Sequence, residues 1–275
     1  MQNFSYHTHT NNLGIFDGRN TPQEMIEEAE KIGFIKIGIS NHLAFHPNMP
    51  DQSQMFFSDF NKACDIYKRV IEDIRTASLN TKIDVKVGFE VDFFPSSEWR
   101  NLFEKIKKEI KADYHIGATH YLRDKTESYI MNLYYLQKHP ELKIKDKDLT
   151  LYLNNYWDNI IESIKSGYFN FIAHLDVCKL FNFCCEPSWN DKKFEVIETL
   201  ASYKQPYELN TSGWTKIGEQ HPHTWMIKEL CKRNVPVIIS DDAHSVNMLA
   251  QHFDKAEKLL AEIKYKNRYC PLFNF

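Results

Sequence analysis

The sequence predicts an α/β barrel of seven parallel strands. Short runs rich in β-branched and aromatic residues alternate with longer helix-like runs, a pattern typical of parallel strands joined by crossover helices. Residue types that bind metals stand at the ends of six of these runs. A barrel brings such ends together at one rim, whereas an open sheet would spread them along a line. The chain of 275 residues suits one barrel domain spanning 1–275.

The predicted strands are short, as strands buried inside an α/β fold usually are. Each is rich in β-branched or aromatic residues and precedes a helix-like run. In chain order they are Phe4–His7, Phe34–Ser40, Val85–Glu90, Tyr114–His120, Phe169–His174, Tyr207–Asn210 and Val235–Ser240.

The predicted helices lie between these strands. The first has the clearest boundaries, because Thr21 can cap it, Pro22 suits its first position and Glu24 completes a capping box. Gly33 can end it. The others span about Phe60–Ala77, Glu98–Lys111, Leu149–Ser166, Asp191–Tyr203, Thr224–Asn234 and Ala250–Ile263. The aromatic, lysine-rich stretch Leu122–Leu149 is long for a loop, so we expect it to form a lid or an interface.

Composition excludes several classes of protein. A formal net charge of −3 leaves no basic excess for a nucleic-acid backbone. The N-terminus shows no signal peptide, and no run reaches the roughly 18 apolar residues of a membrane helix. The 6 cysteines have no paired C-x-x-C spacing, which favours free thiols in a reducing compartment. We therefore expect a cytoplasmic protein that binds neither nucleic acid nor membrane.

Histidines and carboxylates at the strand ends point to a metal site. Side chains at i and i+2 of an extended segment point the same way, so His7-Thr8-His9 can grip one ion and Asp242-Ala243-His244 can present two ligands together. Imidazole and carboxylate suit Zn, Mn or Fe. One histidine at a strand end is more often structural, but the joint pattern favours a metal cluster. The strand-end residues are His7, His9, His42, Glu90, His120, His174, Asp242 and His244.

The remaining histidines are expected to lie outside this cluster. His115 is five residues from His120 and should face the opposite side of its strand. His46 follows His42 in a loop near the expected mouth, where it could contact substrate. The histidines expected at the surface are His139, His221, His223 and His252.

The order of these motifs resembles the polymerase-and-histidinol-phosphatase (PHP) superfamily. Within it, the chain is similar to the monofunctional histidinol-phosphate phosphatases, and the resemblance covers nearly the whole sequence. The motifs that carry it are His7-Thr8-His9, Ser40-Asn41-His42, Gly88-Phe89-Glu90-Val91-Asp92, Gly117-Ala118-Thr119-His120, Ala173-His174-Leu175-Asp176, Glu208-Leu209-Asn210-Thr211 and Ser240-Asp241-Asp242-Ala243-His244.

The resemblance implies a distorted (β/α)7 barrel with three divalent metal ions (Zn, Mn or Fe) at the C-terminal rim of the strands. The first ion would take His7, His9, Glu90 and Asp242. The second would share Glu90 and take His120 and His174. The third would take His42, His244 and a residue of the first loop, where many relatives use histidine and this sequence offers Asp17. Asn41 stands where relatives often carry an acid, and we expect it to contact the ligands without binding the ions.

The resemblance also implies a metal-dependent phosphomonoesterase that hydrolyses L-histidinol phosphate to L-histidinol and phosphate. A metal-bound hydroxide would attack phosphorus, so no side-chain nucleophile is needed. The residues expected to take part in catalysis are Glu90, His120, Asp242 and Asp176, the last to orient a ligand or accept the leaving group's proton. The residues expected to bind the small phosphorylated substrate are Arg19, Arg123, Lys179 and Asn210.

Three alternative functions remain open from the sequence alone. A phosphatase of the same build could act on another small ester, such as an amino-sugar or amino-alcohol phosphate. A phosphodiesterase or exonuclease is disfavoured by the balanced charge. A binding module without activity should have lost ligands, whereas the ligand positions here are filled. The sequence leaves an oligomer possible.

Overall fold

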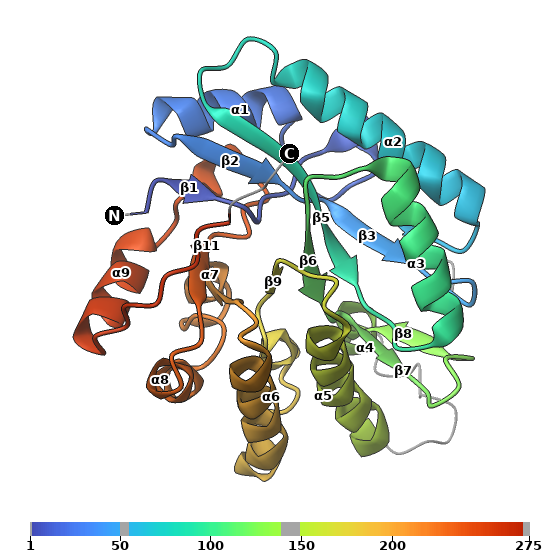
Figure 1. The fold of residues 1–275 in the computed structure, drawn as a ribbon, viewed down its shortest axis with the longest axis vertical. Helices are drawn as coiled ribbons and strands as arrows, with labels where there is room; N and C mark the ends of the chain where they lie inside the picture. Colours follow the sequence, from blue (N-terminus) through green and yellow to red (C-terminus); the bar gives the residue numbers. More distant parts are fainter. Residues whose placement is uncertain (1, 50–54, 139–148, 272–275) are drawn as a thin grey trace.

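Seven parallel strands form the main path of the nine-stranded sheet at the centre of the described structure. The computed structural model describes residues 2–49, 55–138 and 149–271, and it orders the strands β1-β2-β5-β6-β9-β10-β11 (Figure 1). Their bounds are β1 Phe4–Ser5, β2 Lys36–Ile39, β5 Asp84–Asp92, β6 Tyr114–Ala118, β9 Phe171–Ile172, β10 Tyr207–Asn210 and β11 Val237–Ser240. The seven predicted strands and their parallel pairing are thereby confirmed.

The first and last strands meet and nearly close the sheet into a barrel. Just beyond β1 and β11, Thr8 and Ala243 form a parallel bridge, and the His9 amide donates to the Ala243 carbonyl at 2.8 Å. Ser5 Oγ donates to Asp241 Oδ1 at 2.7 Å across the same seam. The predicted barrel is therefore confirmed, and its rim brings the His7–His9 and Asp242–His244 segments together.

Helices cover the outside of the barrel (Figure 1). The helix predicted first begins with the expected capping box, because Thr21 Oγ accepts from the Glu24 amide at 3.3 Å and Glu24 accepts from the Thr21 amide at 2.8 Å. The predicted helices appear as α1 Pro22–Lys31, α2 Phe60–Ala77, α3 Ser97–Ile110, α5 Leu149–Ser166, α6 Asn190–Tyr203, α8 Thr224–Lys232 and α9 Phe253–Glu262. None of the helices that the structure describes has the length and apolar character needed to cross a membrane.

Short elements that the sequence pattern did not predict surround the rim. A break after β2 is followed by β3, which pairs with β5 and β4. Further along the chain, the hairpin β7–β8 leads into α4. The hairpin and α4 occupy the first part of the stretch expected to be a lid or interface, whereas residues 139–148 lie outside the described residues. These additional elements are β3 His42–Phe45, β4 Phe56–Phe57, β7 Tyr121–Arg123, β8 Ile130–Asn132, α4 Leu133–Lys138, α7 Ser212–Ile217 and the 3-10 helices η1 Asn12–Gly14, η2 Val177–Phe181, η3 Pro187–Trp189 and η4 Val246–Met248.

The barrel interior below the rim is filled by side chains. Tyr114 on β6 donates through its hydroxyl to the Tyr6 carbonyl beyond β1 at 2.7 Å. Because these strands are not neighbours in the sheet, the contact crosses the interior. Glycines at 38 and 88, on β2 and β5, leave room for the ring, since a Cβ at either position would overlap Tyr114. Ile116, Phe171 and Ile238 complete this cluster.

Replacing Gly88 with alanine should destabilise the fold by about 1–3 kcal/mol, the usual cost of overpacking a dense core. The new methyl group would overlap the Tyr114 ring, which is held in place by its hydrogen bond across the barrel. Urea unfolding of Gly88→Ala measures the loss. The double variant Gly88→Ala/Tyr114→Leu removes the overlap and should recover part of it, whereas equal losses in both variants would contradict the steric explanation.

Candidate metal centre

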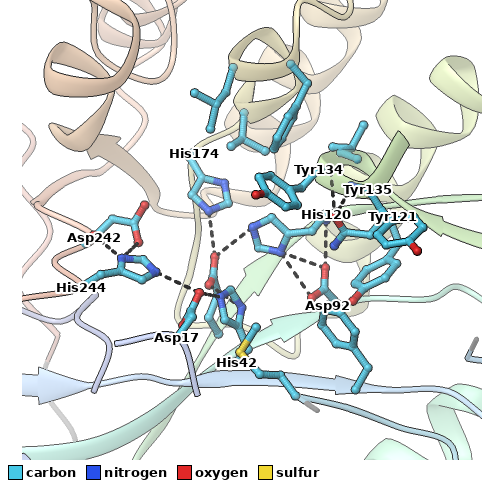
Figure 2. Close-up of a pocket in the computed structure, with 18 of the residues that line it drawn as sticks. Asp17, His42, Asp92, His120, Tyr121, Tyr134, Tyr135, His174, Asp242 and His244 are labelled. Carbon is cyan, nitrogen blue, oxygen red and sulfur yellow. Dashed lines mark hydrogen bonds and ion pairs between the residues drawn. The ribbon is translucent and has the colours of Figure 1, made fainter. Parts of the chain in front are cut away.

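The rim of the barrel gathers all nine predicted metal ligands, eight near strand ends and Asp17 on a loop, into one cluster. They form four overlapping groups, and within each group the candidate ligand atoms lie within 4.8 Å of one another. Figure 2 shows several of these side chains converging on the same space. The groups are His9, Asp17, His42 and His244; His7, Glu90 and His174; His7, His9 and Asp242; and His42, Glu90 and His120.

Glu90 lies at the centre of the cluster. It is on β5 and buried, and its two oxygens face different histidines. Oε1 lies 2.7 Å from His174 Nε2 and 3.5 Å from His120 Nε2. Oε2 lies 3.0 Å from His42 Nδ1. A carboxylate placed in this way can bridge two ions.

His7, His9 and Asp242 occupy the side of the cluster next to the seam. Asp242 Oδ1 lies 3.3 Å from His9 Nε2 and 3.6 Å from His7 Nε2. Among the described residues, His7 Nε2 and both ring nitrogens of His9 have no hydrogen-bond partner, although they are fully buried. Buried polar atoms without partners are costly, and imidazole nitrogens beside carboxylates are ligands that Zn, Mn and Fe prefer. These residues therefore fit a divalent ion.

Asp17 lies where a third ion would need a ligand. The loop after η1 brings Asp17 Oδ2 to 3.5 Å from His42 Nε2 and 3.3 Å from His244 Nε2. Figure 2 shows the three side chains facing one another. Asp17 is 36% exposed, whereas the other two carboxylates of the cluster are buried. A third ion would therefore lie on the solvent side.

Burial and opposing charges set the protonation of the cluster. Burial alone would raise the pKa of Glu90, but His7, His120 and His42 hold that pKa well below its usual value. Burial, together with the neighbouring His244, lowers the pKa of His9 to about 3. Glu90 is therefore a carboxylate and His9 a neutral imidazole at neutral pH, which are the forms that bind metal.

Glu208 orients two of the histidines, a role that its place in the Glu208–Thr211 motif did not predict. From β10, its Oε1 lies 2.6 Å from His7 Nδ1, and its Oε2 accepts from the His174 amide at 2.8 Å. Bonded in this way, the His7 ring presents Nε2 to the cluster. Asn210 in turn donates to Glu208 Oε2 at 3.0 Å. The i, i+2 spacing of Glu208 and Asn210 could have predicted this role, because it places both side chains on the same face of one strand.

Replacing Glu208 with glutamine should weaken metal binding by about 10–100-fold, the usual effect of losing a partner that orients a ligand. Glutamine keeps the size of the side chain but loses the charge that holds His7. Metal titration monitored by competition with a chelating dye measures the affinity. Unchanged affinity, with the fold intact by circular dichroism, would show that Glu208 does not control the His7 ring.

Two further polar residues support the cluster. Asp92 accepts from the His120 amide at 2.9 Å and lies 3.1 Å from His120 Nδ1, so His120 presents Nε2 to Glu90. Asn41 is buried, accepts from the Thr10 amide at 2.8 Å and donates to Asn12 at 2.6 Å. Asn41 therefore holds the loop after β1 through Thr10 and Asn12.

A cavity of about 570 Å³ opens over the cluster. Much of its wall is apolar and aromatic, including Tyr121, Tyr134 and Tyr135 from the β7–β8 hairpin and α4 (Figure 2). Among the described residues, Lys216 of α7 is the one lysine or arginine that lines it. Lys216 Nζ lies 3.3 Å from Asp242 Oδ2, and the side chain is 32% exposed. The sequence did not single out this lysine.

The four residues predicted to bind substrate do not line this cavity, which differs from the expectation. Arg19 is exposed on the first loop. The Arg123 guanidinium is buried and donates to Asn159 on α5 at 3.4 Å. Lys179 Nζ donates to the Gln220 carbonyl at 2.7 Å and pairs with Glu219 at 3.1 Å. Asn210, the last residue of β10, donates to Glu208.

Asp176, predicted to act in catalysis, also lies outside the cavity lining. Its Oδ1 lies 2.9 Å from His221 Nδ1, and its Oδ2 accepts from the His223 amide at 2.8 Å. Lys179 pairs with it at 3.2 Å. Asp176 therefore ties η2 to the segment before α8. The prediction that His221 lies at the surface was wrong, because this contact buries it.

The other histidines divide between core and surface. His115 is buried against Phe103 of α3, which confirms that it faces away from His120. His46, expected near substrate, is instead buried against Glu127 at 2.9 Å and is absent from the cavity lining. His223 is exposed, as predicted, and His252 is half-buried. His139 lies outside the described residues.

Comparisons with known proteins agree with this geometry. The PHP domain family model matches residues 5–212. A "Probable histidinol-phosphatase" of Deinococcus radiodurans is 25% identical over 263 residues, covering 94% of this chain and 92% of that protein.

Two solved structures share the fold. One is histidinol phosphate phosphatase (HisK) from Lactococcus lactis, complexed with Zn, L-histidinol and phosphate. It has a TM-score of 0.67 at 17% identity and covers 96% of this chain and 94% of its own. The other is hisK from Listeria monocytogenes, with a TM-score of 0.65 at 17% identity, covering 92% of this chain and 99% of its own.

Proposed function

This chain belongs to the PHP domain family, and we propose that it hydrolyses L-histidinol phosphate to L-histidinol and phosphate. It is a histidinol-phosphatase-like phosphoric monoester hydrolase that depends on divalent metals. The observation that carries the proposal is the gathering of nine histidine and carboxylate ligands at one rim, beneath a cavity of substrate size. The proposal takes 1–275 as one barrel domain.

The ligand sets support three divalent ions (Zn, Mn or Fe). His7, His9, Glu90 and Asp242 would hold the first. Glu90, His120 and His174 would hold the second, and Asp17, His42 and His244 the third. Such ions would lower the pKa of a water in the site. Their positive charge would also attract the phosphoryl oxygens. The Lactococcus protein binds Zn, L-histidinol and phosphate in the same fold, and this supports the choice of substrate.

The chain's own residues would position the ester. Lys216 lies at the edge of the cluster and can donate to a phosphoryl oxygen while Asp242 holds it in place. The apolar wall of Leu133, Tyr134 and Tyr135 would take the leaving group and exclude water. Asp92 keeps His120 in one orientation as the ester binds. The six cysteines are free thiols, which supports activity in the cytoplasm.

Replacing Lys216 with methionine should raise KM for the phosphate ester about tenfold and change kcat much less. A charge-assisted hydrogen bond to phosphate is worth about 1.5–3 kcal/mol. Steady-state kinetics measures both constants. Lys216→Arg keeps the charge and should retain most of the affinity. Lys228→Met, at an exposed position on α8, is the matched control. A parental KM in Lys216→Met would remove this lysine from substrate binding.

Phosphate release tests the function directly. The protein is stripped with chelator and loaded with Mn²⁺, Zn²⁺ or Fe²⁺ in turn. Each form is then assayed on L-histidinol phosphate beside amino-sugar and amino-alcohol phosphates. We expect selective, metal-dependent turnover of L-histidinol phosphate. Turnover of another monoester, with L-histidinol phosphate untouched, would keep the metal site and overturn the substrate. No release from any monoester would overturn the phosphatase proposal.

A further inference from the structure

The oxygen of the leaving alcohol needs a proton donor in the proposed hydrolysis. When the P–O bond to an aliphatic alcohol breaks, this oxygen takes the bonding electron pair, and the step is slow unless a proton reaches it. Besides the nine candidate ligands, the described residues that line the cavity and carry a titratable group are Asp92, Tyr121, Tyr134, Tyr135 and Lys216.

Three of these groups are unsuited to the role of donor. Asp92 accepts from the His120 amide at 2.9 Å and faces His120 Nδ1 at 3.1 Å, so it acts as a carboxylate. Tyr121 is 2% exposed, and its hydroxyl is buried. Lys216 lies 3.3 Å from Asp242, where the proposed reaction uses it to hold a phosphoryl oxygen. The two tyrosines of α4 remain.

The start of α4 is fixed to the main chain of His120. The Leu133 amide donates to the His120 carbonyl at 2.8 Å. Asn132 Oδ1 accepts from the Tyr134 amide at 2.8 Å, which holds the first turn of the helix in place. Tyr134 is therefore one residue away from a direct contact with a candidate ligand.

The ring of Tyr134 lies across the cavity mouth from this contact. It meets the Phe181 ring of η2 edge-on, with centroids 6.4 Å apart. η2 in turn follows His174, whose carbonyl accepts from the Val177 amide at 2.9 Å. Figure 2 shows Tyr134 pointing from α4 into the cavity, with its hydroxyl towards His120 and His174. Tyr134 is 56% exposed, so both substrate and water can reach it.

We propose that the Tyr134 hydroxyl donates the proton to the leaving oxygen, and that the site thereby suits phosphate monoesters of aliphatic alcohols. This inference rests on the proposed phosphatase function. A phenol can serve because it is a stronger acid than an aliphatic alcohol.

The proton balance of this step closes through solvent. Water attacks phosphorus as the P–O bond breaks, the bonding pair passes to the alcohol oxygen, and the phenolic proton of Tyr134 joins that oxygen. The attacking water gives one proton to solvent, and the exposed tyrosinate takes one back. The net products are the neutral alcohol and hydrogen phosphate.

Removing the hydroxyl alone tests the proposal, because Tyr134→Phe keeps the ring that contacts Phe181. The metal-loaded parental and variant proteins are assayed on L-histidinol phosphate, phenyl phosphate and p-nitrophenyl phosphate. The p-nitrophenolate ion leaves readily without a proton, whereas an alkoxide does not. We expect kcat/KM of Tyr134→Phe to fall about a hundredfold for L-histidinol phosphate, less for phenyl phosphate and hardly at all for p-nitrophenyl phosphate.

Tyr203→Phe is the matched control. Tyr203 ends α6, is 55% exposed and lies outside the cavity lining, so the same change there should leave kcat/KM at the parental value for all three esters. An equal fall for all three esters in Tyr134→Phe would show that the hydroxyl shapes the site without donating the proton. That result, or parental values throughout, would overturn the proposal.

The same assays separate this proposal from the choice of substrate. If the parental protein leaves L-histidinol phosphate intact but hydrolyses an amino-alcohol or amino-sugar phosphate, the proposed substrate is wrong. The donor is then tested by the same comparison with that ester in place of L-histidinol phosphate. Parental hydrolysis confined to aryl phosphates would overturn the donor itself, because a site equipped to protonate the leaving oxygen should hydrolyse alkyl esters.

Discussion

Replacing Glu90 with glutamine is expected to lower kcat/KM for the phosphate ester by about a thousandfold, equivalent to about 4 kcal/mol of transition-state stabilisation. Glu90 lies within 3.6 Å of five histidines of the cluster, which are His7, His9, His42, His120 and His174. A neutral amide in its place can bridge two ions only weakly, so the remaining ligands would hold them with lower affinity and in altered positions.

Steady-state kinetics and metal analysis of the Glu90→Gln protein measure this loss. Glu127→Gln is the matched control, because Glu127 is also buried but pairs with His46 away from the cavity. That control should lose stability and keep activity. If the Glu90→Gln protein keeps the parental turnover and its full metal content, the model of a cluster centred on this carboxylate is contradicted.

Removing the metals should abolish turnover and lower the thermal midpoint by about 10 °C. An ion present at a thousand times its dissociation constant stabilises the native state by about 4 kcal/mol, and each kcal/mol moves the midpoint of a chain of this size by about 2–4 °C. The apo protein should stay folded, because every carboxylate of the cluster already has an imidazole neighbour. Glu90 lies 2.7 Å from His174, and Asp17 and Asp242 each lie 3.3 Å from a histidine.

Scanning calorimetry before and after chelation, and again after each ion is restored, checks both effects. Zn²⁺, Mn²⁺ and Fe²⁺ should each raise the thermal midpoint again, and the ion that the protein binds most tightly should raise it most. Mg²⁺ is the control ion, because it prefers oxygen ligands and this cluster is rich in imidazole. A chelated protein that keeps both its midpoint and its activity would contradict any metal-dependent mechanism.

The barrel could be predicted from the sequence because its signals are local. Each strand is a short β-branched or aromatic run, and the boundaries of the first helix follow from Thr21, Pro22 and Glu24. The ligand positions followed from the same pattern, since a residue at the end of a parallel strand must face the rim. The structure brings Asp17 to His42 and His244 although a loop, and not a strand, carries it.

Cationic residues could not be placed in this way. Arg123 follows His120 by three residues and Lys179 follows His174 by five, but both side chains are held by partners distant in sequence, Asn159 and Glu219. Lys216 lines the cavity because the short helix α7 brings it to Asp242. A helix of this length is too short for hydrophobic periodicity to predict it. Sequence spacing therefore locates ligands on strands better than long side chains on loops.

The seam between β1 and β11 has a consequence for the order in which the protein matures. His7 and His9 leave the ribosome first, whereas Asp242 and His244 follow more than two hundred residues later. Because the Thr8–Ala243 bridge places both pairs side by side, no nascent chain can assemble the whole ligand set before β11 has been synthesised and docked. The complete metal centre would thus form only after translation of β11, and ions bound across the seam would afterwards oppose its reopening.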